Sequence, residues 1–122
     1  MPSIAFSAFP DGQEEAAKHF DEVYQYILAN NLFNENLLYN VNIPHNPTGI
    51  KLTYEGSAYF SDMFIKKGEG LYLQDGAPLQ DEHPDDVNRD TVAIHKGFIS
   101  ISPLIQTRTC INAYQRLKAK GL

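Results

Sequence analysis

The chain contains a single cysteine, Cys110, among its 122 residues. One cysteine excludes an intramolecular disulfide and a zinc site built from several cysteines. We therefore expect a reducing, cytoplasmic environment. No recognisable nucleophile motif surrounds Cys110, so we interpret it as a small buried apolar residue rather than a reactive thiol.

Long apolar runs and basic stripes are also missing. The longest apolar stretch, residues 3–9, is far shorter than the about 20 residues of a membrane span, and no signal-peptide pattern opens the chain. The formal net charge is −5, and the lysines and arginines are mostly scattered. A continuous basic surface is what nucleic acids require, so we expect neither a nucleic-acid nor a membrane partner.

The composition, with 43% hydrophobic and 20% charged residues, is typical of one globular unit. Residues 3–9 read as a buried strand, and residues 13–30 place apolar side chains at helical spacing. That predicted helical face comprises Ala16, Ala17, Phe20, Val23, Tyr24, Ile27 and Leu28, and Asp11 is the expected N-cap. A second strand over 37–43 completes a strand-helix-strand unit of a mainly parallel α/β sheet.

The rest of the chain divides into shorter pieces. Residues 50–54 and 70–73 alternate polar and apolar side chains, which predicts an antiparallel β-hairpin arm over 49–75 after the sheet portion 1–48. An acidic loop follows over 76–90. The segment 91–122 should hold a short helix ended by Gly97, a strand over 98–102, and a C-terminal helix from about Cys110 with Ile111, Tyr114 and Leu117 on one face.

Four segments together resemble the SurE family of survival-protein nucleotidases. They are residues 2–7 (PSIAFS), 40–44 (NVNIP), 49–53 (GIKLT) and 90–104 (DTVAIHKGFISISPL). Their order and spacing are similar to the family pattern over nearly the whole chain. The resemblance implies a 5'/3'-nucleotidase fold, with a β-hairpin arm and a C-terminal helix that join subunits into dimers or tetramers.

The same resemblance implies a missing part. SurE enzymes carry an N-terminal α/β region whose Asp-Asp-Gly motif, serine and asparagine hold Mg²⁺ or Mn²⁺, and no counterpart is found here, which predicts a truncated, C-terminal half. The chain also departs from the family in detail: it has no tryptophan in the strand 70–73, no glycine before Asp90, and no aspartate near Thr107.

Catalytic groups are hard to find in the chain itself. Asp85-Asp86 imitates a metal-binding pair but lies in a polar loop, and the cluster of Asp81, Glu82, His83, Asp85, Asp86 and Asp90 is better explained as a solvated loop. No metal or cofactor is expected to bind this chain, and no catalytic residue is assigned. His45, directly after the strand ended by Pro44, is the candidate for contact with a substrate in a complete enzyme. Asp90 is interpreted as an N-cap that fixes a turn.

The aromatic residues of the middle region form the remaining candidate surface. They are Tyr54, Tyr59, Phe60, Phe64 and Tyr72. A base-stacking platform is conceivable, but packing against another subunit is the preferred interpretation, since an arm with little core must bury its apolar face. The expected function is thus a C-terminal region of a SurE-type phosphatase, inactive alone and able to meet a nucleotide only with an N-terminal half. The alternative is a non-enzymatic oligomerisation or partner-binding module.

Overall fold

The computed structural model describes residues 1–56, 60, 61, 63–77, 79–105 and 111–119, and for residues 111–113 it describes the backbone only. Its centre is a mixed sheet in the order β1-β2-β6-β3, formed by β1 (Ser3–Ala8), β2 (Leu38–Ile43), β6 (Ile99–Pro103) and β3 (Ile50–Leu52). β1 pairs with β2 in parallel, β2 with β6 antiparallel, and β3 with β6 in parallel. The predicted α/β class is confirmed.

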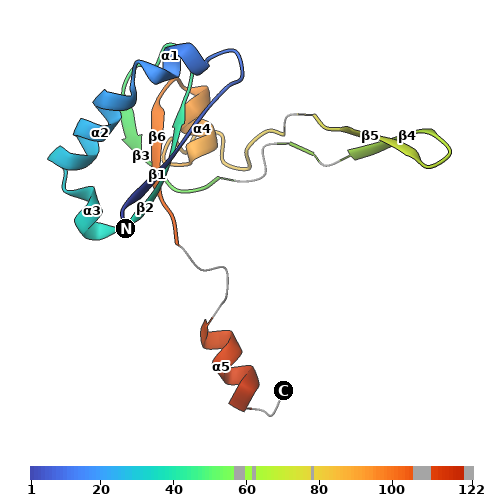
Figure 1. The fold of residues 1–122 in the computed structure, drawn as a ribbon. Helices are drawn as coiled ribbons and strands as arrows, with labels where there is room; N and C mark the ends of the chain where they lie inside the picture. The colour runs from blue at the N-terminus through green and yellow to red at the C-terminus, as the bar shows by residue number, and fades with distance from the viewer. Residues whose placement is uncertain (57–59, 62, 78, 106–110, 120–122) are drawn as a thin grey trace.

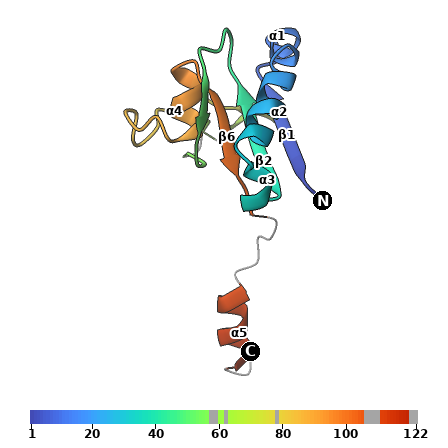
Figure 2. The same ribbon diagram turned by 90° about the vertical axis from the view of Figure 1, so that its left-hand side faces the viewer.

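Helices cover the two faces of this sheet unequally. Figures 1 and 2 show α1 (Gln13–Ala17), α2 (Phe20–Ala29) and α3 (Leu32–Glu35) on one face and α4 (Asp90–His95) on the other. The segment expected as one helix over 13–30 is interrupted at Lys18 and His19. Its exit is marked by Asn31, whose φ of 53° is left-handed, a conformation that asparagine tolerates better than most residues. In the described part of the chain no helix combines the length and apolarity needed to cross a bilayer.

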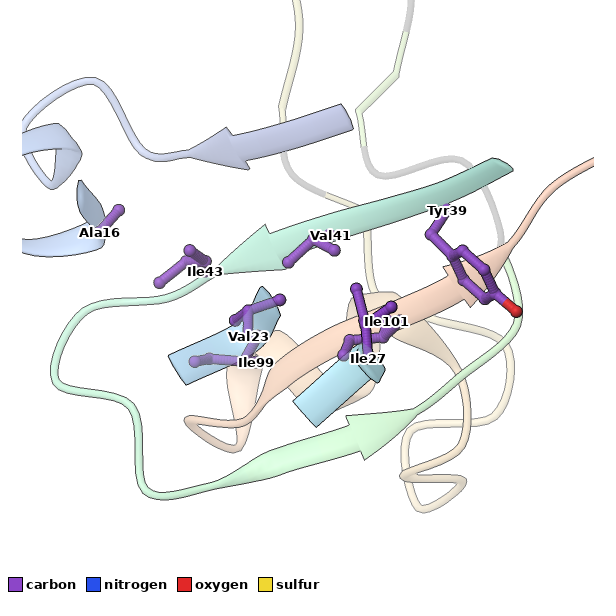
Figure 3. Packing of buried hydrophobic residues seen from close by; sticks show 8 residues of the cluster. All are labelled: Ala16, Val23, Ile27, Tyr39, Val41, Ile43, Ile99 and Ile101. Carbon is purple, nitrogen blue, oxygen red and sulfur yellow. The ribbon is translucent and has the colours of Figure 1, made fainter. Parts of the chain in front are cut away.

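The core lies between α2 and the two central strands. Figure 3 shows Val23 and Ile27 of α2 beside side chains of β2 and β6. The buried cluster comprises Ala16, Val23, Ile27, Tyr39, Val41, Ile43, Ile99 and Ile101. Because side chains alternate along a strand, every second residue of β2 and β6 enters this core. The remaining ones, among them Ser100 and Ser102, face α4.

Two predictions about the first third are wrong. Phe20, Tyr24 and Leu28, expected in the buried helical face, are each more than 40% exposed. Among the described residues the sheet ends at β1 on that side, and it covers only the narrower stripe of Ala16, Val23 and Ile27. Asp11 does not cap the helix either: Gly12 is the N-cap residue, and it makes no side-chain capping hydrogen bond.

The predicted arm is shorter than expected. Residues 50–52 belong to the main sheet as β3, because their backbone pairs with β6. The hairpin consists of β4 (Met63–Gly68) and β5 (Leu71–Asp75), paired antiparallel and turned at Gly70 with a φ of 70°. Figure 1 shows it extending from the sheet, and α5 (Ile111–Ala119) lying apart from the sheet. The predicted short helix, the Gly97 turn and the strand after it are confirmed as α4 and β6.

Candidate functional site

The carboxyl ends of β1 and β2 lie next to each other, because the two strands are parallel and in register from Ser3 to Ala8. This end of an open α/β sheet is where ligands usually bind. The chain continues there into Phe9, Pro10 and Asp11 after β1, and into Pro44 and His45 after β2. His45, the candidate for substrate contact, therefore lies at this end of the sheet.

His45 is held by two neighbours from the β1 loop. Its Nε2 atom is 3.2 Å from Oδ1 of Asp11, and its ring stacks on Phe9 with centroids 5.4 Å apart. A side chain at Gly12 would collide with the imidazole, since a Cβ there would be 2.9 Å from Cε1 of His45. The glycine thus permits the close packing. The imidazole remains half exposed, so it can reach a ligand from this position.

A cavity of about 260 Å³ opens beside this end of the sheet, on the face that carries α4. It is lined by Ser7, Ala8, Phe9, Asn40, Asn42, Ile43, Asp90, Thr91 and Ile94. The asparagines belong to a polar row on this face: Asn42 Nδ2 donates to Ser100 Oγ at 3.2 Å, and the hydroxyls of Thr53 and Ser102 are 2.8 Å apart. These cavity residues were missed from the sequence, although the alternation of Asn40 and Asn42 in a strand indicates a polar face.

The acidic loop is tied to α4 through one carboxylate. Asp81 receives hydrogen bonds from the Thr91 hydroxyl and from the backbone N–H of His83, and its Oδ1 is 2.8 Å from Nε of Arg89. Both charged side chains are nearly buried, at 7% and 12% exposure. The Thr91 hydrogen bond contributes most to lowering the pKa of Asp81, from 3.8 to about 2.

Asp90 also has a structural role at this point. Its Oδ1 accepts the backbone N–H of Gly56 at 2.6 Å and that of Thr91 at 2.7 Å. The helix begins at Asp90 with Arg89 as the N-cap residue, so the predicted cap position is off by one. The carboxylate joins the chain after β3 to the first turn of α4.

The predicted aromatic arm residues separate into different environments. Tyr54 lies beyond β3, where its hydroxyl donates to Asp86 Oδ2 at 2.5 Å and its ring lies under the Arg89 guanidinium, so it is not part of the hairpin. Phe60 precedes the hairpin. Phe64 and Tyr72 lie on β4 and β5, are 66% and 58% exposed, and share one face of the hairpin as diagonal neighbours. Tyr59 and Cys110 lie outside the described residues.

Comparisons with known proteins identify the family. No protein-family model matches the chain. Over an alignment of 134 positions it is 31% identical to the 5'-nucleotidase SurE of Microcystis aeruginosa, and the alignment covers 96% of this chain and 50% of that protein. For the 5'-nucleotidase SurE of Desulforamulus reducens the identity is 30% over 112 residues, with 85% and 44% covered. The crystal structure of the SurE protein from Aquifex aeolicus matches with a TM-score of 0.64 and 25% identity, covering all of this chain and 52% of that one.

This chain belongs to the SurE family. It spans about half the length of the curated SurE relatives it matches. The resemblance carried by the four sequence segments is therefore confirmed, and the SurE fold accommodates the whole chain.

The divalent metal implied by the SurE resemblance does not fit the carboxylates of the acidic loop and of α4. Metal sites need several oxygen ligands converging on one point. Instead, Asp81, Asp86 and Asp90 each accept hydrogen bonds from neighbouring protein groups. Among the described residues no group of three His, Cys, Asp or Glu side chains is arranged to hold a metal ion. The Asp85-Asp86 pair lies in the acidic loop, where Asp86 accepts the hydrogen bond of the Tyr54 hydroxyl.

Asp81→Asn is expected to make the free energy of unfolding depend less steeply on pH under acidic conditions. The folded-state pKa of Asp81 lies below the unfolded value, so its stabilising effect is full above pH 3.8 and is lost as the pH falls through about 2. Urea midpoints measured every half pH unit between 2 and 5 should therefore change less steeply in the variant. Asp85→Asn, in an exposed part of the same loop, is the control. Equal slopes in both variants and the parent would contradict this role for Asp81.

Proposed function

We propose that this chain is the C-terminal, assembly-forming half of a SurE-type nucleotidase. It completes the sheet, supplies the surfaces for oligomerisation, and hydrolyses no phosphate ester by itself. The observation that carries this proposal is the extent of the match. The whole of this chain aligns with a SurE structure, whereas only about half of that structure aligns with this chain. Hydrolysis of nucleoside 5'- and 3'-monophosphates with Mg²⁺ or Mn²⁺ then belongs to the complete assembly, whose metal is bound by the other half.

The bonding of the acidic residues supports inactivity of the chain alone. A metal-dependent phosphatase uses its ion to neutralise phosphate charge and to activate water or stabilise the leaving oxygen. Asp81 and Asp90 instead attach the loop and the segment after β3 to α4, as described above. Freeing either carboxylate for a metal would break the contacts that hold these segments together.

His45 is the residue of this half that we place nearest to the substrate. It lies at the carboxyl ends of two parallel strands, with its ring fixed by Phe9 and Asp11. An imidazole in this position can donate a hydrogen bond to a phosphate or sugar oxygen. Its role is contact and orientation in the complete enzyme.

The hairpin and α5 support the oligomerisation part of the proposal. Both faces of the hairpin carry exposed apolar side chains: Phe64 and Tyr72 on one face, and Met63 and Leu73 on the other. Tyr114 and Leu117 of α5 are about half exposed. Exposed apolar surface of this kind is typical of protein interfaces. We propose a homo-oligomer, a dimer or a tetramer, joined through these two elements.

The purified chain should show no phosphatase activity and a mass above that of one subunit. The assay is hydrolysis of p-nitrophenyl phosphate with Mn²⁺ or Mg²⁺, with light scattering on the same sample and a metal-only blank. Activity that disappears with a chelator would contradict the assignment of all chemistry to the other half. A folded oligomer that stays inactive after addition of a complementary SurE fragment would favour the alternative, a non-enzymatic interaction module.

A further inference from the structure

The chain contains two Asp-Gly pairs, Asp11-Gly12 and Asp75-Gly76, which the fold places in opposite environments. In such a pair the glycine nitrogen can attack the aspartate Cγ, because no glycine side chain blocks the approach. The nitrogen gives up its hydrogen and the carboxyl its hydroxyl group, which leave together as water, and a five-membered succinimide ring forms. Water then opens the ring. Attack at Cγ restores aspartate, whereas attack at the backbone carbonyl leaves isoaspartate, in which the main chain runs through Cγ.

The Asp11-Gly12 pair is locked by the fold. Gly12 is buried, donates its N–H to Phe9 O at 2.9 Å, and accepts that of Ala16 as the N-cap residue of α1. Oδ1 of Asp11 lies 3.2 Å from Nε2 of His45. The ring can therefore close here only after the start of α1 and the turn before it have opened locally.

The Asp75-Gly76 pair holds its reacting atoms close together. Both residues are exposed at the end of β5, where the chain leaves the hairpin. The Gly76 N–H donates to Oδ1 of Asp75 at 2.8 Å. Because Oδ1 is bonded to Cγ, this contact keeps the carbon that is attacked beside the nitrogen that attacks it. The N–H that has to react is thus engaged with the carboxylate itself and not with a partner strand.

We propose that Asp75 is a site of spontaneous isoaspartate formation, from which the fold protects Asp11. The product carries a free α-carboxyl group at position 75, on an exposed segment of the chain. The enzyme class that recognises this group is a carboxyl methyltransferase specific for isoaspartate. The proposal goes beyond the proposed function and does not depend on it.

The base of the hairpin should register the change. Met63 pairs with Asp75. Further along, Ser61 donates its N–H to Ala77 O at 3.0 Å, and its Oγ accepts the N–H of Ala77 at 3.0 Å. Gly76 lies between these two pairs, so close to Ser61 O that a Cβ there would collide with it. Isoaspartate adds one methylene to the main chain at this point, so the pairs on its two sides can no longer form in one register.

Ageing of the purified chain at neutral pH tests the assignment. Isoaspartate is counted by methyl transfer from labelled S-adenosylmethionine with an isoaspartyl methyltransferase, and it is located by electron-transfer fragmentation of the peptides. In the folded chain it should accumulate at least about tenfold faster at Asp75 than at Asp11, because only Asp11 requires local opening. Equal rates at the two positions would overturn the proposal.

The same measurement in urea separates the fold from the flanking sequence. Both pairs are free in the unfolded chain, so their rates should agree within about threefold. The rate at Asp75 should change little between the two conditions, whereas the rate at Asp11 should rise on unfolding. A preference for Asp75 that persists unchanged in urea would show that the fold does not cause it and would overturn the proposal.

Asp75→Glu is the matched variant. It keeps the charge, but the corresponding ring has six members and closes far more slowly, so the modification at this position should disappear. In the isoaspartate-containing fraction of the aged parent, the amides of Ser61 and Ala77 should exchange at least about tenfold faster than in fresh protein, because their pairing is lost. In aged Asp75→Glu they should exchange as in fresh protein. Equal acceleration in both aged proteins would contradict the effect assigned to Asp75.

Discussion

Replacing Ile101 with alanine is expected to lower the free energy of unfolding by about 2–5 kcal/mol. Ile101 is fully buried at the centre of the sheet, where β6 pairs with both β2 and β3. Its side chain packs in the cluster that includes Val23 and Ile27 of α2. The loss combines the transfer energy of the missing methyl groups with the cost of a cavity. A domain of this size has only about 5–15 kcal/mol of net stability, so the variant should be largely unfolded well below the parent's melting temperature.

Leu52→Ala is the matched control for this substitution. Leu52 pairs with Ile101 across the β3–β6 ladder but is 55% exposed, so its truncation removes less buried surface and leaves no enclosed cavity. Urea unfolding followed by circular dichroism gives both values. A change at Ile101 no greater than that at Leu52 would mean that the core is centred elsewhere.

Phe64→Ala is expected to weaken self-association of the chain by at least about tenfold. Phe64 is among the most exposed apolar side chains of the hairpin, and it shares a face with Tyr72. Aromatic residues at the centre of an interface commonly contribute about 2 kcal/mol or more, and 1.4 kcal/mol is a tenfold change in affinity. The measurement is sedimentation equilibrium over a concentration series.

Gln74→Ala serves as the control on the same hairpin, because Gln74 lies directly opposite Phe64 on β5. It removes a polar side chain of comparable length from the same face and leaves the hairpin register unchanged. If both variants associated with the dissociation constant of the parent, the hairpin face would be excluded as the subunit contact. Circular dichroism of both proteins verifies that neither change unfolds the main sheet.

Local patterns were sufficient to predict most elements of the fold. The helical spacing of Ala16, Val23 and Ile27 and the alternation of Tyr39, Val41 and Ile43 depend on the residues themselves, and these positions are buried as expected. The alternation over 50–54 correctly indicated a strand, but the prediction placed that strand in the hairpin arm, whereas residues 50–52 belong to the main sheet. Periodicity reports that a strand has two faces and says nothing about its hydrogen-bond partner, which here is β6, almost 50 residues away.

The position of the candidate site in the fold could be predicted in part, although its role stays a prediction. His45 was singled out because it follows a strand, and its neighbour Phe9 follows another. The ion pair of Asp81 and Arg89 was missed, since it depends on the path of an irregular loop. The exposure of Phe20 was also missed, because a helical pattern records which residues are apolar but not how far the sheet extends beneath them.

The central position of β6 determines when this fold can form during synthesis. β6 is the last strand among the described residues, yet it lies between β2 and β3 and pairs with both. During synthesis the described four-stranded sheet therefore cannot assemble until residues 99–103 have left the ribosome, although β1 and β2 can already pair. Contacts between residues so far apart in sequence slow folding. Until then the apolar face of α2 lacks Ile99 and Ile101, so the interval before β6 arrives is when the growing chain is most exposed to aggregation and most in need of chaperones.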